Sequence, residues 1–154
     1  MSYVTEGTVW PEALALDDSV KNVISLFYQL ADDNDPQAGP RMASEVFTPD
    51  GKFVAAGGSF QGKEEISRSR DNAPRMTKAR RHEIRKVFVN DKQGHDLFLL
   101  GQAKLDFVNG KTVEAPFATH VVINARSSAA GSPRLESLEV FADSAPIANA
   151  LKKD

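Results

Sequence analysis

Apolar residues near the start of the chain recur every three or four positions, whereas apolar and polar residues alternate in its second half. The first pattern predicts a helix with one wide apolar face. Asp17 and Asp18 supply capping oxygens and negative charge at its start, and the polar run at 32–36 ends it. The apolar face is made of Val20, Val23, Ile24, Phe27, Tyr28 and Ala31.

Shorter elements are expected between this helix and residue 77. A second helix begins at Pro40, which is a favourable first helical position. Turn-forming residues at 48–51 precede a short strand at 52–55, and a more polar helix covers 63–70. Residues 1–16 form an arm whose position the sequence does not indicate. The single domain is therefore expected to span residues 17–151.

The second half predicts an antiparallel sheet. Asn109-Gly110 is a strong signal for a two-residue hairpin loop between its second and third strands. Helices followed by such a sheet predict an α+β fold, in which the helices cover one face of a strongly curved sheet and enclose a cavity. A last helix is expected at 144–151. The alternation gives four strands, at 79–89, 96–108, 112–124 and 134–142.

The hairpin loop also determines which side chains share a face of the sheet. A two-residue loop places Leu99 opposite His120. Symmetric closure of the flanking loops brings Ala103 opposite His82, and it also brings Glu139 near His120. Side chains that lie directly opposite one another share a face. One face is then expected to carry His82, Ile84, Phe88, Leu97, Leu99, Ala103, Leu105, His120, Glu139 and Phe141.

The opposite face of the predicted sheet is apolar as well. Strands that are apolar on both faces are buried on both faces, and the predicted helices are too few to cover the second one. A second copy of the chain is the simplest cover, so we expect a homodimer formed through this outer sheet face. A bulge near Pro116 would exchange the two faces over part of a strand. The residues concerned are Val113, Ala115, Phe117, Val121, Ile123, Leu138 and Val140.

The bulk composition narrows the classes of function. The chain has 154 residues, enough for one domain with a real core, and its net charge of −2 gives no reason to expect nucleic acid as a partner. It has no cysteine, so disulfides, thiolate nucleophiles and cysteine-ligated zinc are excluded. No apolar run approaches the roughly 20 residues that cross a bilayer, and the start of the chain lacks a signal-peptide pattern. We therefore expect no membrane partner and a cytoplasmic location.

Several segments resemble a known group of proteins. They are the amphipathic first helix, "FTPDGKFVAAGGSFQGKEEI" at 47–66, "RRHEI" at 80–84 and "LEVFADSAPI" at 138–147. Together they resemble the SnoaL-like group, within the superfamily that also holds nuclear transport factor 2, ketosteroid isomerase and scytalone dehydratase. The likeness runs over about residues 17–151, nearly the whole chain.

This resemblance has implications for fold and activity. It implies a cone-shaped α+β fold with a pocket between the helices and the concave face of the sheet, and frequently a dimer. Members of the group include polyketide cyclases, dehydratases and isomerases, and also binding and scaffold domains without catalysis. The "DSAPI" ending resembles that of fungal members that act on intermediates of secondary metabolism.

His82 and His120 are the first candidates for catalysis. The resemblance implies a pocket histidine at His82, and a histidine exchanges protons near neutral pH. His120 is flanked by apolar residues, and Glu139 would orient it or act as a base. Asp143 would bind substrate or cap the last helix. In the structural alternative, each histidine only hydrogen-bonds a neighbouring element and Glu139 is an exposed strand carboxylate.

Four further side chains are expected at the cavity. Leu99, Leu105 and Phe141 would form its apolar wall, and the hydroxyl of Tyr28 would reach its mouth unless Tyr28 is an ordinary boundary tyrosine. The resemblance implies that a tyrosine of the first helix holds a substrate oxygen. Similar dehydratases place an acidic residue beside that tyrosine, whereas Gln29 stands at this position here.

No cofactor is expected. The three histidines lie in separate elements without paired spacing, which gives a metal site no support. The chain has no Gly-rich phosphate loop and no nucleophile motif. The stretch 63–86 holds nine Lys or Arg residues against four Asp or Glu residues, and it either binds an anionic ligand group at the cavity rim or forms a solvated face.

Two functions therefore remain open. The first is a cofactor-independent isomerase, dehydratase or cyclase that moves protons on a small apolar, polyketide- or terpenoid-like substrate, with His82, His120 and Glu139 in the catalytic roles. The second is a non-catalytic dimeric domain of the same fold that binds a small ligand or serves as a scaffold.

Overall fold

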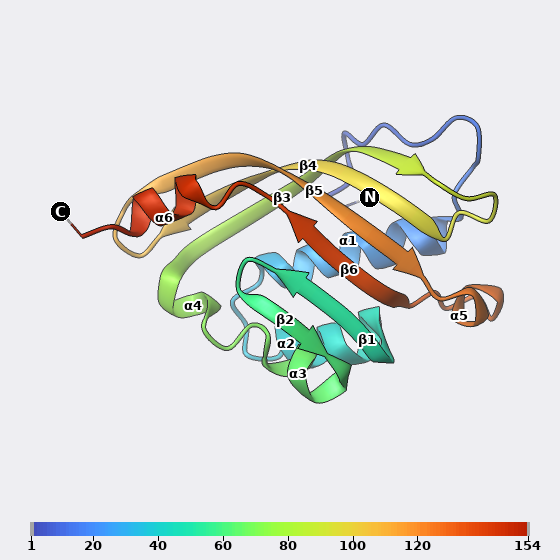
Figure 1. Ribbon diagram of the computed structural model, residues 1–154, viewed down its shortest axis with the longest axis horizontal. Coiled ribbons are helices and arrows are strands. Elements are labelled where there is room, and N and C mark those ends of the chain that lie inside the picture. Colours follow the sequence, from blue (N-terminus) through green and yellow to red (C-terminus); the bar gives the residue numbers. More distant parts are fainter. Residues whose placement is uncertain (1, 154) are drawn as a thin grey trace.

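A six-stranded sheet curves over a long helix in the computed structural model, which describes residues 2–153 (Figure 1). The strands lie in the order β2-β1-β6-β5-β4-β3. The β1 and β6 strands are parallel, whereas the other neighbouring pairs are antiparallel. Helices packed on a curved, mainly antiparallel sheet confirm the predicted α+β cone. No helix in residues 2–153 has both the length and the apolar character needed to cross a membrane.

The elements follow the predicted order with several additions. The strand expected at 52–55 begins earlier, a further strand precedes the helix expected at 63–70, and a short helix capped by the Asn124 side chain lies between the last two predicted strands. The helical elements are α1 (Asp18–Asp32), α2 (Ala38–Arg41), the π-helical turn η1 (Met42–Val46), α3 (Gly62–Arg68), α4 (Ala73–Met76), α5 (Ala125–Ala129) and α6 (Ala145–Leu151). The strands are β1 (Phe47–Ala55), β2 (Gly58–Gln61), β3 (Thr77–Val89), β4 (Asp96–Phe107), β5 (Thr112–Ile123) and β6 (Leu135–Phe141).

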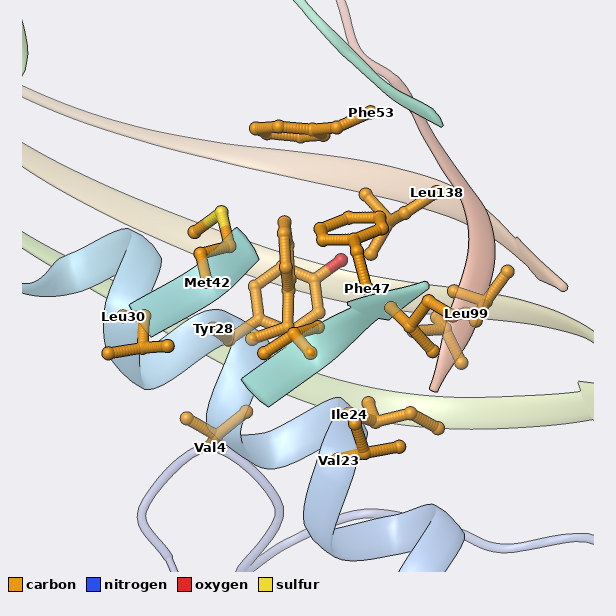
Figure 2. Close-up of a cluster of buried hydrophobic side chains, with 14 of the residues drawn as sticks. Val4, Val23, Ile24, Tyr28, Leu30, Met42, Phe47, Phe53, Leu99 and Leu138 are labelled. Atoms are coloured by element: carbon orange, nitrogen blue, oxygen red, sulfur yellow. The ribbon is translucent and has the colours of Figure 1, made fainter. Parts of the chain in front are cut away.

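The core forms between α1 and the concave face of the sheet. Five of the six residues of the predicted stripe of α1 are buried there, and Ala31 is partly buried. Figure 2 shows Val23, Ile24 and Tyr28 of this stripe together with Leu99 and Leu138 from the sheet. An aromatic cluster joins α1 to β1, because the Phe27 ring lies 5.3 Å from that of Phe53, centroid to centroid. Each fully buried side chain of this size contributes about 1.5–3 kcal/mol relative to exposure.

The hairpin between β4 and β5 has a longer loop than predicted. Phe107 N–H donates to the Lys111 carbonyl at 2.8 Å, and Gly110 adopts φ 87° inside a three-residue loop. The pairing therefore shifts by one residue, so that Phe98 and not Leu99 lies opposite His120. Since side chains alternate along a strand, this single residue moves the whole of β5 to the other face.

A bulge in β3 changes a second set of predicted positions. The pairing with β4 shifts between Ile84 and Lys86, so that Val87 points into the core and Phe88 points out. The β4–β5 register, in contrast, runs without interruption through Pro116.

The outer face of the sheet is consequently made of different residues from those predicted. Phe117 and Val121, expected between subunits, are buried inside the protomer, so this part of the dimer prediction is wrong. The face still carries an apolar patch, in which the Phe98 and Phe141 rings lie 6.4 Å apart. Its exposed large residues, called the outer patch below, are Phe88, Phe98, Leu100 and Phe141.

The arm, whose position the sequence did not indicate, packs beside the free edge of β3 (Figure 1). Val4 is buried and its carbonyl accepts a hydrogen bond from Ile84 N–H at 2.8 Å. Farther along, Val9 forms a parallel bridge with Lys86. The arm therefore covers an edge that would otherwise offer unpaired backbone groups.

Candidate functional site

The structure separates the three residues that were expected to act together. His82 lies on the concave face, whereas His120 and Glu139 lie opposite each other on the outer face. The same register shift puts Phe141 on the outer face, half exposed. The prediction that these four side chains line one cavity is therefore wrong, and its cause is the one-residue difference in the hairpin loop.

His120 instead forms a pair on the outer surface. Its Nε2 atom lies 2.6 Å from Oδ1 of Asp96, and both side chains are more than a third exposed. Hydrogen bonds from Asn90 and then from His120 hold the pKa of Asp96 below its usual range. This pair is accessible to solvent and lies across the sheet from the aromatic core.

The other predicted site residues lie in the core or beside the start of α6. Tyr28 and Leu99 are fully buried in the core, and Leu105 packs against it. Asp143 accepts a hydrogen bond from Ala145 N–H at 2.9 Å, which is the helix-capping alternative. The Tyr28 hydroxyl is 2.7 Å from Oγ1 of Thr119 and does not reach a surface. Burial raises the pKa of Tyr28 far above its usual value, so the phenol stays neutral.

On the concave side, His82 pairs with Asp32, a residue that the sequence analysis had assigned only to the end of the first helix. Asp32 is the last residue of α1, and its Oδ1 atom lies 2.5 Å from Nδ1 of His82 on β3. The Asp32 side chain is 5% exposed and that of His82 is 18% exposed. A carboxylate in this position fixes the tautomer of the imidazole, with the proton on Nδ1.

The second oxygen of Asp32 is fully engaged as well. Oδ2 accepts hydrogen bonds from the backbone N–H of His82 at 2.9 Å and from the hydroxyl of Tyr3 at 2.7 Å. Burial acts to raise the pKa of Asp32, but the hydrogen bonds from His82 and Tyr3 outweigh it and hold the pKa below its usual range. Asp32 is therefore an ionised acceptor over the whole neutral pH range.

Aromatic rings surround the imidazole. The rings of Tyr28 and Phe117 each lie 5.3 Å from that of His82, centroid to centroid. Among the hydrogen bonds within residues 2–153, none involves Nε2 of His82. In the tautomer set by Asp32, this nitrogen carries a lone pair, so it is the atom that can take a proton from a ligand.

Two arginines close the C-terminal end of α1 next to the pair. Arg80 donates to the Ala31 carbonyl at 3.3 Å, and Arg70 donates to the Asp33 carbonyl at 3.1 Å. Burial, and then repulsion from Arg80, lower the pKa of Arg70 to about 10. Cations at this end interact favourably with the negative end of the helix dipole, and they add positive charge near the Asp32 carboxylate.

His82 does not line either of two cavities in the described part of the chain. One of about 380 Å³ lies between the arm and β3 and is lined in part by Tyr3, Arg81 and Glu83. The other, of about 330 Å³, lies near Asp50 and Glu136. Within residues 2–153, no group of three or more His, Cys, Asp or Glu side chains is placed to hold a metal ion.

The sequence contained one usable signal for Asp32. Gln29 stands where similar dehydratases have an acidic residue, and it points in another direction from the helix axis than Tyr28 does. Residues four apart share a face of a helix, and Asp32 follows Tyr28 by four. The helical spacing therefore places Asp32 on the face of Tyr28, but its pairing with His82 also depends on the register of β3.

The sequence matches no family model and no curated protein. Solved structures do match. An NTF2-like protein of unknown function from Burkholderia pseudomallei K96243 has 14% identity and a TM-score of 0.68, with 90% of this chain and 100% of that chain covered. TerC, co-crystallised with polyporic acid, has 16% identity, a TM-score of 0.66 and coverages of 89% and 100%. A hexachlorocyclohexane dehydrochlorinase, LinA type 2, has 11% identity, a TM-score of 0.65 and coverages of 82% and 84%.

These likenesses extend over most of each chain at very low identity. They establish a shared architecture and leave the chemistry of this chain to its own residues. The resemblance noted in the sequence is confirmed at this level: the chain has the NTF2-like fold.

Proposed function

We propose that the protein is a cofactor-independent enzyme that moves a proton on a small, largely apolar molecule, as an isomerase, dehydratase or cyclase. The observation that carries this proposal is the His82–Asp32 pair, in which a buried carboxylate orients an imidazole whose Nε2 makes no hydrogen bond within residues 2–153. An oriented imidazole of this kind is a general base that works near neutral pH.

The proposed reaction begins with removal of a proton from a carbon next to a carbonyl. Nε2 of His82 forms the new N–H bond, and the electron pair of the broken C–H bond moves into the carbonyl to form an enolate. The Asp32 carboxylate stabilises the imidazolium cation. Nε2 then delivers a proton, either the one it removed or one exchanged with solvent, to another carbon, which is isomerisation, or to a departing hydroxyl as water leaves, which is dehydration. General base catalysis of this type contributes about 10²–10⁴-fold in rate.

The surroundings of His82 favour an apolar substrate. The rings of Tyr28 and Phe117 lie beside the imidazole, and aromatic rings offer stacking and dispersion contacts. A similar solved structure is a hexachlorocyclohexane dehydrochlorinase, which supports an eliminating or proton-transfer chemistry on this fold without fixing it for this chain.

Solvent isotope exchange tests the proposal without knowledge of the natural substrate. A panel of small cyclic ketones, β-hydroxy ketones and enolisable polyketide-like compounds is incubated with the protein in D₂O, and deuterium uptake or loss of water is followed by mass spectrometry. We expect at least one compound to react, and His82→Gln to reduce its rate about 10²-fold or more. His120→Gln is the matched control, because it makes the same change on the outer face.

Equal rates for the wild type and His82→Gln on every compound that reacts would contradict the proposal. A panel without any reaction, combined with tight binding of one of its members, would favour the alternative function, a non-catalytic dimeric domain that binds a small ligand or serves as a scaffold. One observation favours that alternative. Neither of the two cavities described above is lined by His82, and the aromatic residues beside it, Tyr28 and Phe117, are buried.

The proposal includes a homodimer formed through the outer face of the sheet. The outer patch exposes three aromatic rings and one leucine on β3, β4 and β6, which is more than isolated surface apolar residues provide. A stable dimer would bury well above roughly 1,000 Å² in total.

A further inference from the structure

Tyr3 brings the N-terminal arm into direct contact with the acid of the proposed catalytic pair. Its hydroxyl donates a 2.7 Å hydrogen bond to Oδ2 of Asp32, the oxygen that also accepts from the backbone of His82. Tyr3 lies 29 residues before Asp32 and outside the helices and strands of the fold. This contact therefore depends on how the arm docks and not on the pairing of the sheet.

The arm is held firmly enough to place this hydroxyl. Val4 is buried next to Tyr3, and its carbonyl accepts from Ile84 N–H at 2.8 Å. Thr8 Oγ1 donates to the Ile84 carbonyl at 2.6 Å, and the guanidinium of Arg81 lies 4.5 Å from the centre of the Tyr3 ring. The bonds at Val4 and Thr8 hold the backbone that follows Tyr3, and Arg81 lies over its ring, so the arm presents the hydroxyl to Asp32.

We propose that Tyr3, carried by the arm, is a positioning residue for the His82–Asp32 pair and acts through its hydroxyl. Two donors on Oδ2 prevent the carboxylate from rotating about its last bond, and Oδ1 then stays aimed at Nδ1 of His82. Without the Tyr3 hydroxyl, one backbone donor remains on Oδ2 and the carboxylate gains rotational freedom. Orientation of the imidazole then weakens, since it depends on this carboxylate.

The electrostatic setting agrees with a donor role for Tyr3. Burial and then the hydrogen bond to Asp32 raise the pKa of Tyr3 far above its usual value, so its hydroxyl keeps the proton that it donates. The charged and titratable groups that interact with Asp32 or Tyr3 are His82, Tyr28, Asp33, Arg70, Arg80 and Arg81. Tyr3→Phe leaves all of these in place, and it retains the ring over which Arg81 lies.

This inference rests on the proposed function, but its test needs no substrate. The protein contains three histidines, so ¹⁵N-histidine labelling gives few signals, and His82→Gln assigns those of His82. Two-bond ¹H–¹⁵N correlation at neutral pH reports the tautomer through the separation of the Nδ1 and Nε2 resonances. We expect Tyr3→Phe to reduce this separation, because the imidazole of His82 then becomes a mixture of the Nδ1–H and Nε2–H tautomers. In a ¹³C-aspartate titration, the midpoint of Asp32 moves up towards its usual range.

Thr8→Val is the matched control, because it removes another hydroxyl of the arm without touching Asp32. Unchanged His82 resonances in Tyr3→Phe would overturn the inference, and so would equal changes in Thr8→Val, which would assign the effect to docking of the arm in general. Circular dichroism verifies that each variant is folded. If these spectra change as expected but no carbon acid reacts, only the proposed function fails. If His82→Gln abolishes a reaction but Tyr3→Phe leaves the spectra unchanged, only the positioning role fails.

Discussion

Replacement of Asp32 by asparagine separates the structural role of this residue from its chemical role. The amide oxygen takes the place of Oδ2, where it accepts from Tyr3 and from the backbone of His82. The amide nitrogen then takes the place of Oδ1 and faces Nδ1 of His82. An NH₂ group can only donate, so Nδ1 must accept and the imidazole proton must move to Nε2. The opposite amide orientation would set two donors against each other at the backbone of His82.

The structure gives magnitudes for both effects. Asp32→Asn keeps three hydrogen bonds and converts them from charge-assisted to neutral, a loss of about 1 kcal/mol each that the lower cost of burying a neutral amide partly offsets. We expect a net loss of about 1–2 kcal/mol in the free energy of unfolding. Asp32→Ala leaves three donors without their acceptor and should cost about 3–6 kcal/mol. Activity should fall about 10⁴-fold in Asp32→Asn, the cost of a wrong imidazole tautomer in a catalytic triad.

Three measurements on one variant check this reasoning. Urea unfolding gives the change in stability, ¹⁵N-histidine spectra give the tautomer, and deuterium exchange of a reactive ketone gives the activity. Asp96→Asn makes the same substitution beside His120 and should change stability by less than about 1 kcal/mol, since that pair is exposed. An Asp32→Asn protein that keeps the proton on Nδ1 of His82, or that keeps full activity with the proton on Nε2, would refute the argument.

Three further predictions concern acid stability, packing and assembly. The folded-state pKa of Asp32 lies below its usual 3.8, so its contribution to the free energy of unfolding is complete above that value and is lost as pH falls through the folded pKa. In urea titrations, Asp32→Asn should therefore lose less stability than the wild type over that acid range. A Cβ added at Gly101 would lie 2.4 Å from Cζ of Phe117, so Gly101→Ala should cost about 1–3 kcal/mol and shift the His82 resonances, and unchanged spectra would contradict this packing. Sedimentation should show a dimer that Leu100→Asp dissociates and Lys104→Asp does not, whereas a monomeric wild type at tens of micromolar would exclude the dimer.

The architecture was accessible from sequence because its signals are repetitive. The stripe of α1 from Val20 to Ala31 and the four alternating segments after Thr77 each contain many positions that agree, so single errors do not change the outcome. Even the pair Ala103 and His82 was correctly matched across two strands. The arm carries no period at all, and its contact with β3 depends on the surface of a folded sheet.

The faces of the strands were less accessible because they depend on single residues. The sequence Val108-Asn109-Gly110 closes either a two-residue or a three-residue loop, and the structure uses the latter with Gly110 in the left-handed region. That one residue decides whether His120 or Thr119 points into the core. The bulge after Ile84 has a similar effect on Phe88. Periodicity shows that a strand has two different faces, but the turn determines which of them points inward.

A purely structural role for the His82–Asp32 pair leaves one feature of it unexplained. Attaching the end of α1 to β3 requires an acceptor for the His82 backbone N–H, and an asparagine side chain supplies that acceptor without burying a charge. The third bond, from Nδ1 of His82 to Asp32, adds a fixed imidazole tautomer. A fixed tautomer has a physical consequence only at the other nitrogen, Nε2, where it places a lone pair among aromatic rings. Three donors on one buried carboxylate are what the proposed proton transfer at Nε2 requires, because they hold the imidazole in the tautomer that it uses.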